Sequence, residues 1–257
     1  MNILLSGICG FMGREVVKLC ETNYRGASLA FGVDPCGGAE VYKSFDEIPS
    51  GEYIDCIIDF SHHSATPALL DFAVTNCLPL VLCTTGHTDE EIDLIHNAAK
   101  NIPIFYSGNM SIGIALLIEL AKTTATALPE AEIEIIEKHH DRKVDAPSGT
   151  ALMLANAIRE VRPESYTNCG RSGQGKRTPE EIGIHSIRMG NIVGEHEVII
   201  GTATQTITLK HEAHNRALFA EGAIAAADFL VDREPGMYDM KSMLSSERAT
   251  DAVVTAE

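Results

Sequence analysis

The amino-acid sequence of 257 residues predicts an α/β protein, in which a doubly wound parallel sheet is joined to a second, α+β part with a mostly antiparallel sheet. Through the first hundred residues, short apolar strands alternate with helical patterns, which is typical of parallel strands covered by helices on both faces. After Pro129, strand patterns follow one another, which favours antiparallel pairing. We therefore expect a first domain at residues 1–108, completed by 216–245, and a second at 109–215.

The elements of the first domain follow from local patterns. Residues 2–6, NILLS, form an apolar run typical of a buried strand, and residues 11–21 have the spacing of a helix. The other strands are short apolar runs, and the other helices are the longer stretches between them. We expect strands at 28–33, 53–60, 78–82 and 102–106, and helices at 64–75, 89–100 and 112–128.

The second domain has a different rhythm. Residues 131–136, AEIEII, alternate as in a half-exposed strand, and the strands at 183–188, 196–201 and 205–210 have no helix between them. Helices are expected at 151–158, after a Pro-Ser-Gly-Thr turn, and at 216–230, where the chain returns to the first domain. The segment 168–179 is rich in glycine and cations and should be mobile, and residues after about 245 should fray.

Composition and charge exclude several classes of function. A formal net charge of −16 argues against a nucleic-acid or anionic-membrane partner, since both need a basic face. The seven cysteines are scattered, odd in number and without a CxxC pair, so we expect neither a disulfide framework nor a metal site. No leader pattern and no apolar run near the roughly 18 residues of a membrane span are present, which predicts a cytoplasmic protein.

A glycine-rich loop follows the first predicted strand. Gly7, Gly10 and Gly13 form a GxxGxxG pattern that opens the helix at 11–21, where a Rossmann fingerprint binds a pyrophosphate on a helix N-terminus. Asp34 closes the second strand, where an acidic side chain accepts hydrogen bonds from the adenosine ribose. Cys9 stands where the usual pattern has its middle glycine. The other interpretation is a glycine-rich turn that binds nothing.

The same residues bear on the form of the cofactor. Asp34 is followed by Pro35, and Phe11 brings no charge to the loop, so a 2′-phosphate would meet an acid without an arginine. We therefore expect NADH to be preferred over NADPH, although Lys43 or another distant cation could still reach a 2′-phosphate. Phe11 and Met12, within the loop, are counted with the cofactor-binding residues.

Two further turns lie at the carboxyl ends of predicted strands, where open α/β sheets bind ligands. One is Cys83-Thr84-Thr85-Gly86, and the other contains Asn109 and Met110. We assign these six residues to the cofactor site. The alternative is that they are ordinary polar loop residues.

The segment 137–151, EKHHDRKVDAPSGTA, concentrates chemistry in fifteen residues. It holds His139, His140 and Lys143, followed by a small-residue turn and the start of an apolar helix. Proton donors, a cation and a helix N-terminus suit a small anion that must be protonated, because a helix start binds a carboxylate through free N–H groups. An ordinary helix cap with surface histidines is the alternative, but a cap needs neither the histidine pair nor the lysine.

These motifs carry a resemblance to a known family. The sequence resembles the 4-hydroxy-tetrahydrodipicolinate (dihydrodipicolinate) reductases of diaminopimelate and lysine biosynthesis, over nearly the whole chain up to about Lys241. The likeness lies in GICGFMG at 7–13 in the glycine loop, CTTG at 83–86, the segment 137–151, GNIVGEH at 190–196, and the run 215–223. The resemblance implies an NAD(P)H-dependent reduction of a cyclic imine dicarboxylate and a homotetramer formed through the second domain's sheet. The first domain would then bind the dinucleotide and the second the substrate.

The resemblance also implies roles for individual residues. His139 resembles the family's proton donor, and Lys143 the cation that assists it. The substrate would be bound by the following residues: His140, Ser148, Gly149, Thr150 and Thr85. Arg216 is similar to an arginine near the family's domain hinge, and Asp145 is expected to order the loop or cap the helix.

Two other functions stay open at this point. One is a different two-domain NAD(P)-dependent dehydrogenase acting on an amino or keto acid, which would share the glycine loop but would have no use for the segment 137–151. The other is a non-catalytic nucleotide-binding protein, which would not need His139 and Lys143.

Overall fold

The computed structural model describes residues 1–38, 40–49, 51 and 53–245. The chain divides into two compact units, one of residues 1–111 with the segment from Arg216 onward, and one of residues Ile112–Asn215. The fraying predicted for the end of the chain falls outside the described residues. Among the described residues, no helix is both long and apolar enough to cross a membrane.

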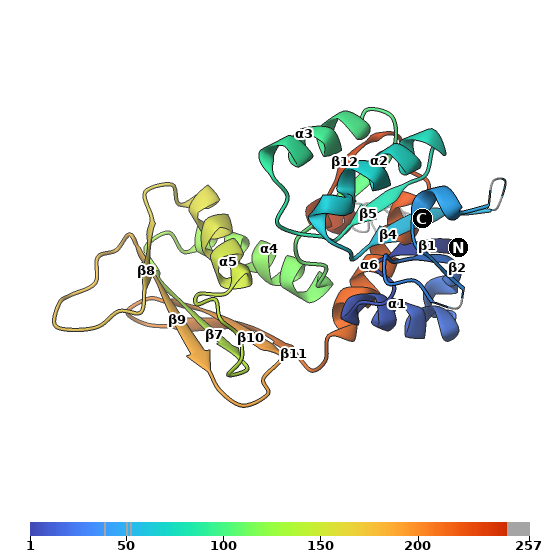
Figure 1. The fold of residues 1–257 in the computed structure, drawn as a ribbon. Coiled ribbons are helices and arrows are strands. Elements are labelled where there is room, and N and C mark those ends of the chain that lie inside the picture. The colour runs from blue at the N-terminus through green and yellow to red at the C-terminus, as the bar shows by residue number, and fades with distance from the viewer. Residues whose placement is uncertain (39, 50, 52, 246–257) are drawn as a thin grey trace, which may run out of the picture. The chain divides into compact units, whose positions relative to one another are not determined.

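Unit 1 contains a parallel sheet in the order β12-β6-β5-β4-β1-β2-β3 within the described residues. Helices α2 and α3 lie on one face and α1 and α6 on the other, so the predicted doubly wound sheet is confirmed (Figure 1). The strands are β1 (Asn2–Ser6), β2 (Ser28–Val33), β3 (Val41–Tyr42), β4 (Cys56–Asp59), β5 (Leu80–Leu82), β6 (Pro103–Tyr106) and β12 (Gly236–Tyr238). The helices are α1 (Phe11–Glu21), α2 (Thr66–Thr75), α3 (Asp89–Ala98) and α6 (Ala217–Leu230).

Several predicted boundaries in unit 1 were wrong. Strand β4 begins at Cys56 and not at residue 53. The Asp55 carboxylate accepts the Asn2 N–H at 2.6 Å, and Cys56, opposite Ile3, is the first residue of β4 that pairs with β1. Strand β5 begins at Leu80 and not at residue 78, since Pro79 has no N–H to donate. The two-residue β3 and the three-residue β12 were not predicted, because such short edge strands carry no periodic signal.

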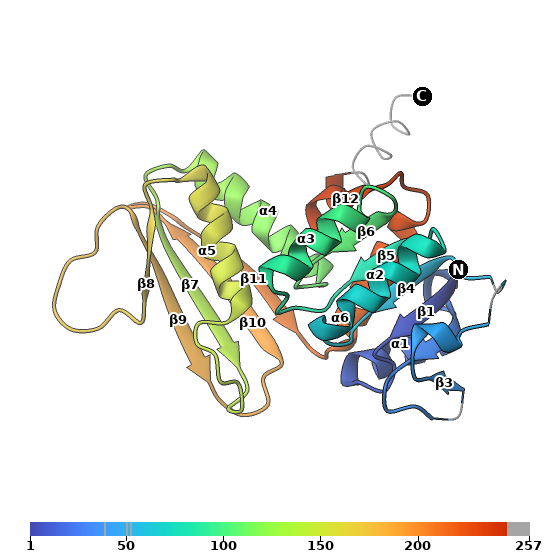
Figure 2. The ribbon, with the colours of Figure 1, turned by 45° about the horizontal axis from the view of Figure 1, so that its top comes forward.

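Unit 2 contains a second sheet, in the order β11-β10-β7-β9-β8, with α4 (Ile112–Ala127) and α5 (Gly149–Val161) on one face (Figure 2). Its strands are β7 (Glu132–His139), β8 (Tyr166–Cys169), β9 (Glu181–Arg188), β10 (Gly194–Gly201) and β11 (Thr206–Ala213). The antiparallel pairs β11–β10 and β10–β7 align more residues than the parallel pairs β7–β9 and β9–β8, which confirms a mostly antiparallel sheet. Strand β8 was missed.

Alternating burial along β7 determines which of its side chains face the helices of unit 2. Ile133 and Ile135 point into the core formed with α4 and α5, and the alternation continues to the end of the strand. Glu137 and His139 therefore occupy the same helix-facing side as these isoleucines. The predicted strand ended at residue 136, so the sequence analysis did not extend the alternation to these two side chains.

The loop between β8 and β9 is held to its own sheet by two of its cations. The Arg171 guanidinium donates to both carboxylate oxygens of Glu181, at 2.8 and 2.7 Å. Arg177 donates to the backbone carbonyl groups of Ile133 and Glu181. These contacts fasten the loop ends to β7 and β9.

Helix α6 provides a test of close packing in unit 1. A Cβ atom added to Gly222 would overlap the backbone carbonyl oxygen of Met110. Gly222→Ala should therefore lower the free energy of unfolding by about 1–3 kcal/mol, as overpacking does. Urea unfolding measures the change, with Gly175→Ala as control, because a Cβ there would meet nothing within 4 Å. Equal stabilities of the two variants would contradict this packing.

Candidate functional site

The glycine loop is a tight turn between β1 and α1. Gly7 has a φ of +80°, and a Cβ there would lie 2.5 Å from the Phe60 carbonyl oxygen. A Cβ on Gly13 would overlap the carbonyl oxygen of Gly7, so the helix packs directly on the loop. Gly10, at the start of α1, provides no side-chain cap. Backbone N–H groups at the helix start are thus left for an anion, as a pyrophosphate requires.

Asp34 joins the glycine loop to the turn after β2. Its carboxylate accepts the Cys9 N–H at 3.1 Å and the Cys36 N–H at 3.0 Å, one on each oxygen. Burial raises the pKa of Asp34, but these backbone hydrogen bonds outweigh burial and hold the pKa below its ordinary value. The ionised carboxylate retains lone pairs that can accept ribose hydroxyls.

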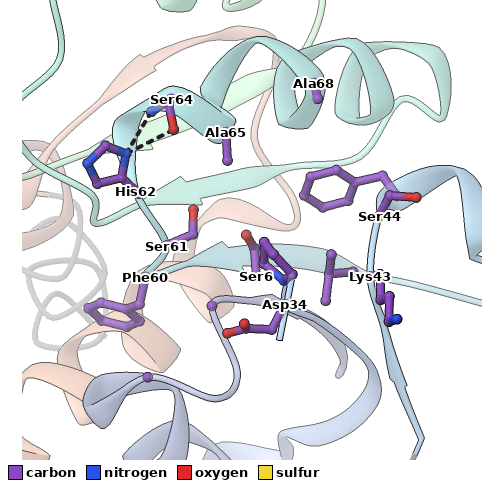
Figure 3. Close-up of a pocket in the computed structure, with 15 residues that line it drawn as sticks. Ser6, Asp34, Lys43, Ser44, Phe60, Ser61, His62, Ser64, Ala65 and Ala68 are labelled. Carbon is purple, nitrogen blue, oxygen red and sulfur yellow. Dashed lines mark hydrogen bonds between the residues drawn. The ribbon is translucent and has the colours of Figure 1, made fainter. Parts of the chain in front are cut away.

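A cavity of about 440 Å³ opens between these loops. Figure 3 shows Asp34 on one side of it, with Lys43, Ser44, Ala65 and Ala68 along its walls. The apolar part of the lining suits a flat base, and the carboxylate beside it suits a ribose. The residues present therefore fit the adenosine part of a dinucleotide.

Phe11 is exposed and stacks with a cation that the sequence analysis did not place there. The Arg216 guanidinium lies 5.1 Å from the centroid of the Phe11 ring. This arginine precedes α6, so a residue some two hundred positions along the chain brings positive charge to the start of α1. Met12, the next residue in the loop, is partly exposed.

The turn after β5 separates its four residues by burial. The side chains of Cys83 and Thr84 are buried, and the Thr84 hydroxyl donates to the buried Asp59 carboxylate at 2.6 Å. Burial raises the pKa of the Cys83 thiol well above its ordinary value. Thr85 and Gly86 are exposed. Of the four residues in this turn, Thr85 and Gly86 are therefore the ones that a ligand can reach.

The turn after β6 lies beside the turn after β5. A Cβ on Gly108 would be 3.4 Å from the Thr85 Cγ2 atom. The Asn109 side-chain oxygen accepts the Ser111 N–H at 2.9 Å, which shapes the turn. Met110 is buried, with its backbone against α6. The structure thus gives the Met110 side chain a packing position, while Asn109 is half-buried at the edge.

A buried carboxylate organises the predicted acid–base residues of unit 2. Glu137 is fully buried, and its Oε2 atom lies 2.6 Å from Nδ1 of His139. Arg188 donates to both oxygens, at 2.8 and 2.6 Å, and the Ser148 N–H donates to Oε1 at 3.1 Å. Burial raises the pKa of Glu137, but the hydrogen bonds from His139, Arg188 and Ser148 hold it well below its ordinary value.

The loop after β7 brings the lysine to the same arginine. The Lys143 ammonium lies 2.8 Å from a carboxylate oxygen of Asp145, and Arg188 donates to the Asp145 carbonyl oxygen at 2.6 Å. The hydrogen bond from Lys143 holds the pKa of Asp145 below its ordinary value. Asp145 therefore orders the loop and does not cap the helix, which narrows the two roles expected for it. His140 is half-buried and accepts the Lys143 N–H through its carbonyl group.

Helix α5 starts where the sequence predicted an anion-binding turn. Ser148 is its cap, since its hydroxyl oxygen accepts the Ala151 N–H at 3.2 Å. A Cβ on Gly149 would meet no atom within 4 Å, so the space beside the helix start is open. Thr150 is half-buried in the first turn. The space beside Gly149, at the positive end of the helix dipole, is thus open to a carboxylate.

His196 of β10 closes the cluster from the neighbouring strand. Its Nε2 atom lies 3.2 Å from the Ser148 hydroxyl, and its ring centroid lies 5.2 Å from that of His139. Burial, with the His139 imidazole nearby, lowers the pKa of His196 to about 4. A neutral imidazole therefore sits between the helix start and His139.

Two family descriptions match this chain. The model of "Dihydrodipicolinate reductase, N-terminus" matches residues 1–110, and that of "Dihydrodipicolinate reductase, C-terminus" matches residues 113–244. The chain belongs to the dihydrodipicolinate reductase family.

Members of the family resemble this chain over most of its length. The 4-hydroxy-tetrahydrodipicolinate reductase of Clostridium tetani is 44% identical over 96% of this chain and 98% of its own. That of Caldanaerobacter subterraneus subsp. tengcongensis is 43% identical over 95% and 98%. A solved structure of a dipicolinate-bound dihydrodipicolinate reductase from Paenisporosarcina sp. TG-14 aligns with a TM-score of 0.79 at 25% identity, covering 93% of this chain and 97% of that one.

Sequence reasoning missed the residues that hold the family's motif together. Glu137 opened the segment 137–151 and His196 ended GNIVGEH, but neither was assigned a role. Arg188 and Asp59 carried no signal, because their partners lie on other strands or turns.

Among the described residues, no group of three or more histidine, cysteine or acidic side chains is arranged to hold a metal ion.

His196 gives this site an acid-sensitive stability. Its pKa is about 4 in the folded protein and near 6.5 in an unfolded chain, so the unfolded state binds the extra proton first as pH falls. The free energy of unfolding should fall by at most about 3 kcal/mol between these two values. His196→Gln should flatten this part of the pH–stability curve, measured by urea unfolding. The exposed His96→Gln is the control, and identical slopes in both variants would contradict the assignment.

Proposed function

We propose that this protein is a 4-hydroxy-tetrahydrodipicolinate reductase, which uses NAD(P)H to form tetrahydrodipicolinate in diaminopimelate and lysine biosynthesis. The observation that carries the proposal is the hydrogen-bonded pair of Glu137 and His139, set among Lys143 and an open helix start. The names of the relatives and the glycine loop of unit 1 support the same activity.

The residues of unit 2 divide the chemistry of the reduction. A bound nicotinamide dinucleotide supplies the hydride. His139 keeps its Nδ1 proton on Glu137, so its Nε2–H, present when the ring is protonated, is the proton that passes to the substrate. Lys143 neutralises the charge that the substrate carries, and the turn Ser148-Gly149-Thr150 at the start of α5 holds one carboxylate, with His140 as a further contact. Thr85 of unit 1 is proposed as another substrate residue.

The glycine loop and Asp34 support binding of the dinucleotide by unit 1. We propose that Gly7, Gly10 and Gly13 bring the backbone to the pyrophosphate and that Asp34 accepts the ribose hydroxyls. Because a 2′-phosphate would approach this buried carboxylate, NADH is the preferred form and NADPH the weaker one. We infer that Lys43, in the wall of the same cavity, is one cation that a 2′-phosphate would meet when NADPH binds.

The assembly and setting follow from the same proposal. The face of the five-stranded sheet opposite α4 and α5 has no helix of unit 2 on it, and the residues of β11 alternate between exposed and half-buried. We propose that this face forms the subunit contact of a homotetramer. The protein would act in the cytoplasm on a small dicarboxylate, without a nucleic-acid or membrane partner. A different amino- or keto-acid dehydrogenase would leave the pair of His139 and Lys143 without a purpose.

Replacing either proton-handling residue tests the reaction itself. His139→Ala and Lys143→Ala should each lower kcat by about a hundredfold or more. The first variant lacks the proton donor, and the second lacks the cation that neutralises the substrate's charge. The assay follows oxidation of NADH by its absorbance, coupled to the synthase that forms the unstable substrate. Cofactor binding, measured by calorimetry, should be unchanged. Turnover near that of the unaltered protein in either variant would refute that residue's role.

Replacing Asp34 tests the cofactor preference. Asp34→Ala removes the acceptor for the 2′-hydroxyl and the charge that repels a 2′-phosphate. The Kd for NADH should therefore rise by about tenfold, the value of roughly one charged hydrogen bond, while the Kd for NADPH rises less or falls. Asp46→Ala, in a neighbouring exposed turn, is the control. Equal losses for both cofactors would contradict the ribose assignment.

A further inference from the structure

We propose that Glu137 is a positioning residue, which fixes the tautomer of His139 and so decides which ring nitrogen can exchange a proton with the substrate. The inference rests on the proposed function of His139 as the proton donor. It adds a residue to which neither the motif nor the relatives' names give a role.

The hydrogen bonds around the carboxylate dictate its state. Oε2 lies near Nδ1 of His139 and accepts from Arg188, while Oε1 accepts from Arg188 and from the Ser148 N–H. Three of these four contacts are donations from groups that have no acceptor role at those atoms. The bidentate pair with the positively charged Arg188 holds the carboxylate ionised, and an ionised carboxylate only accepts hydrogen bonds. It follows that His139 carries a proton on Nδ1 in both its neutral and its charged forms.

The opposite ring nitrogen is then the one that changes its protonation. Nε2 lies 3.1 Å from the position that a Cβ on Gly194 would occupy, and the neighbouring Cδ2 lies 3.4 Å from it. The absence of a side chain at Gly194 therefore leaves room for this edge of the ring. The neutral His139 is an acceptor at Nε2, and the protonated His139 is a donor there, which is the pair of states that a proton donor needs.

The Glu137 carboxylate also connects the start of α5 to the loop that carries Lys143. Its Oε1 holds the Ser148 N–H at the start of α5, and its partner Arg188 also holds the carbonyl group of Asp145, next but one to Lys143. Glu137 and the neutral His196 lie against His139, Arg188 is held to the same carboxylate, and the charge of Lys143 acts on the neighbouring His196. Because Arg188 already balances the charge of Glu137, the main effect of Glu137 on His139 is orientation and choice of tautomer.

The tautomer can be read directly in the unaltered protein. Nitrogen-15 NMR of protein labelled in histidine distinguishes a ring protonated on Nδ1 from one protonated on Nε2, and His139→Asn identifies the signal. At a pH where His139 is neutral, we expect the proton on Nδ1. A neutral His139 protonated on Nε2 would overturn the proposal, and this measurement needs no variant of Glu137.

The variant Glu137→Gln then links the tautomer to turnover. The amide can donate to Nδ1, so the neutral ring should move its proton to Nε2 and lose the ability to accept one there. We expect kcat to fall about a hundredfold or more, with a smaller change in KM and with NADH binding in unit 1 unchanged. Glu137→Asp keeps the negative charge and should recover part of the turnover and the original tautomer.

A matched pair on the same strand provides the control. Glu134 lies on β7 with its carboxylate 3.0 Å from Nε2 of His185, so Glu134→Gln makes the same chemical change outside the site. Its kcat should stay near that of the unaltered protein. Full turnover in Glu137→Gln, with His139→Ala inactive, would overturn the positioning role alone. Full turnover in His139→Ala would overturn the proposed function, while the NMR result would still decide the tautomer.

Discussion

The structure of unit 2 depends on one buried carboxylate. Removing a charge from water costs several kcal/mol, and this cost is met only where the geometry and the remaining hydrogen bonds are complete. Glu137 meets the condition because β7, β9, the loop after β7 and the start of α5 each bring a donor or a donor's partner to it. No single one of these segments could keep the carboxylate buried and ionised. The charge therefore selects the arrangement in which all four meet.

In unit 1, buried carboxylates likewise connect neighbouring loops at the carboxyl edge of the parallel sheet. Asp34 joins the glycine loop to the turn after β2, and Asp59 joins the turn after β4 to that after β5 through Ser61 and Thr84. Both carboxylates are satisfied by N–H and hydroxyl groups of neighbouring loops. Short loops of this kind have little apolar surface to bury, so a charge that needs several donors is an effective way to fix them. Loop positions are thus determined together and not one at a time.

Much of the fold could be predicted from the sequence, and the exceptions have physical causes. The bounds of β1, α1 and β2 were predicted correctly, because their apolar runs and helical spacing are clear and the glycine loop marks the boundary between β1 and α1. The candidate site was found as residue types, yet its organiser was missed. Glu137 and His139 share a face only if β7 continues to residue 139, and the apolar alternation that predicts the strand stops at Ile136. Arg188 and His196 reach the site through strand pairing, which local patterns do not encode.

The ion pairs Glu137–Arg188 and Lys143–Asp145 differ in the free energy that breaking them costs. This difference separates a pair that holds the structure together from a pair that can change partners. The pair of Glu137 and Arg188 is bidentate around a carboxylate with 0% of its side chain exposed, so removing one partner leaves a buried charge and costs about 3–5 kcal/mol. In the other pair, the side chains of Lys143 and Asp145 are 24% and 50% exposed, and such pairs are worth about 0–1 kcal/mol. Lys143 can therefore leave Asp145 for another carboxylate at little cost, whereas Arg188 cannot leave Glu137. In a protein with a formal net charge of −16, a dianion needs a cation that is available in this way. The stronger pair keeps the cluster around Glu137 assembled, and the weaker pair leaves the Lys143 ammonium available to an anion.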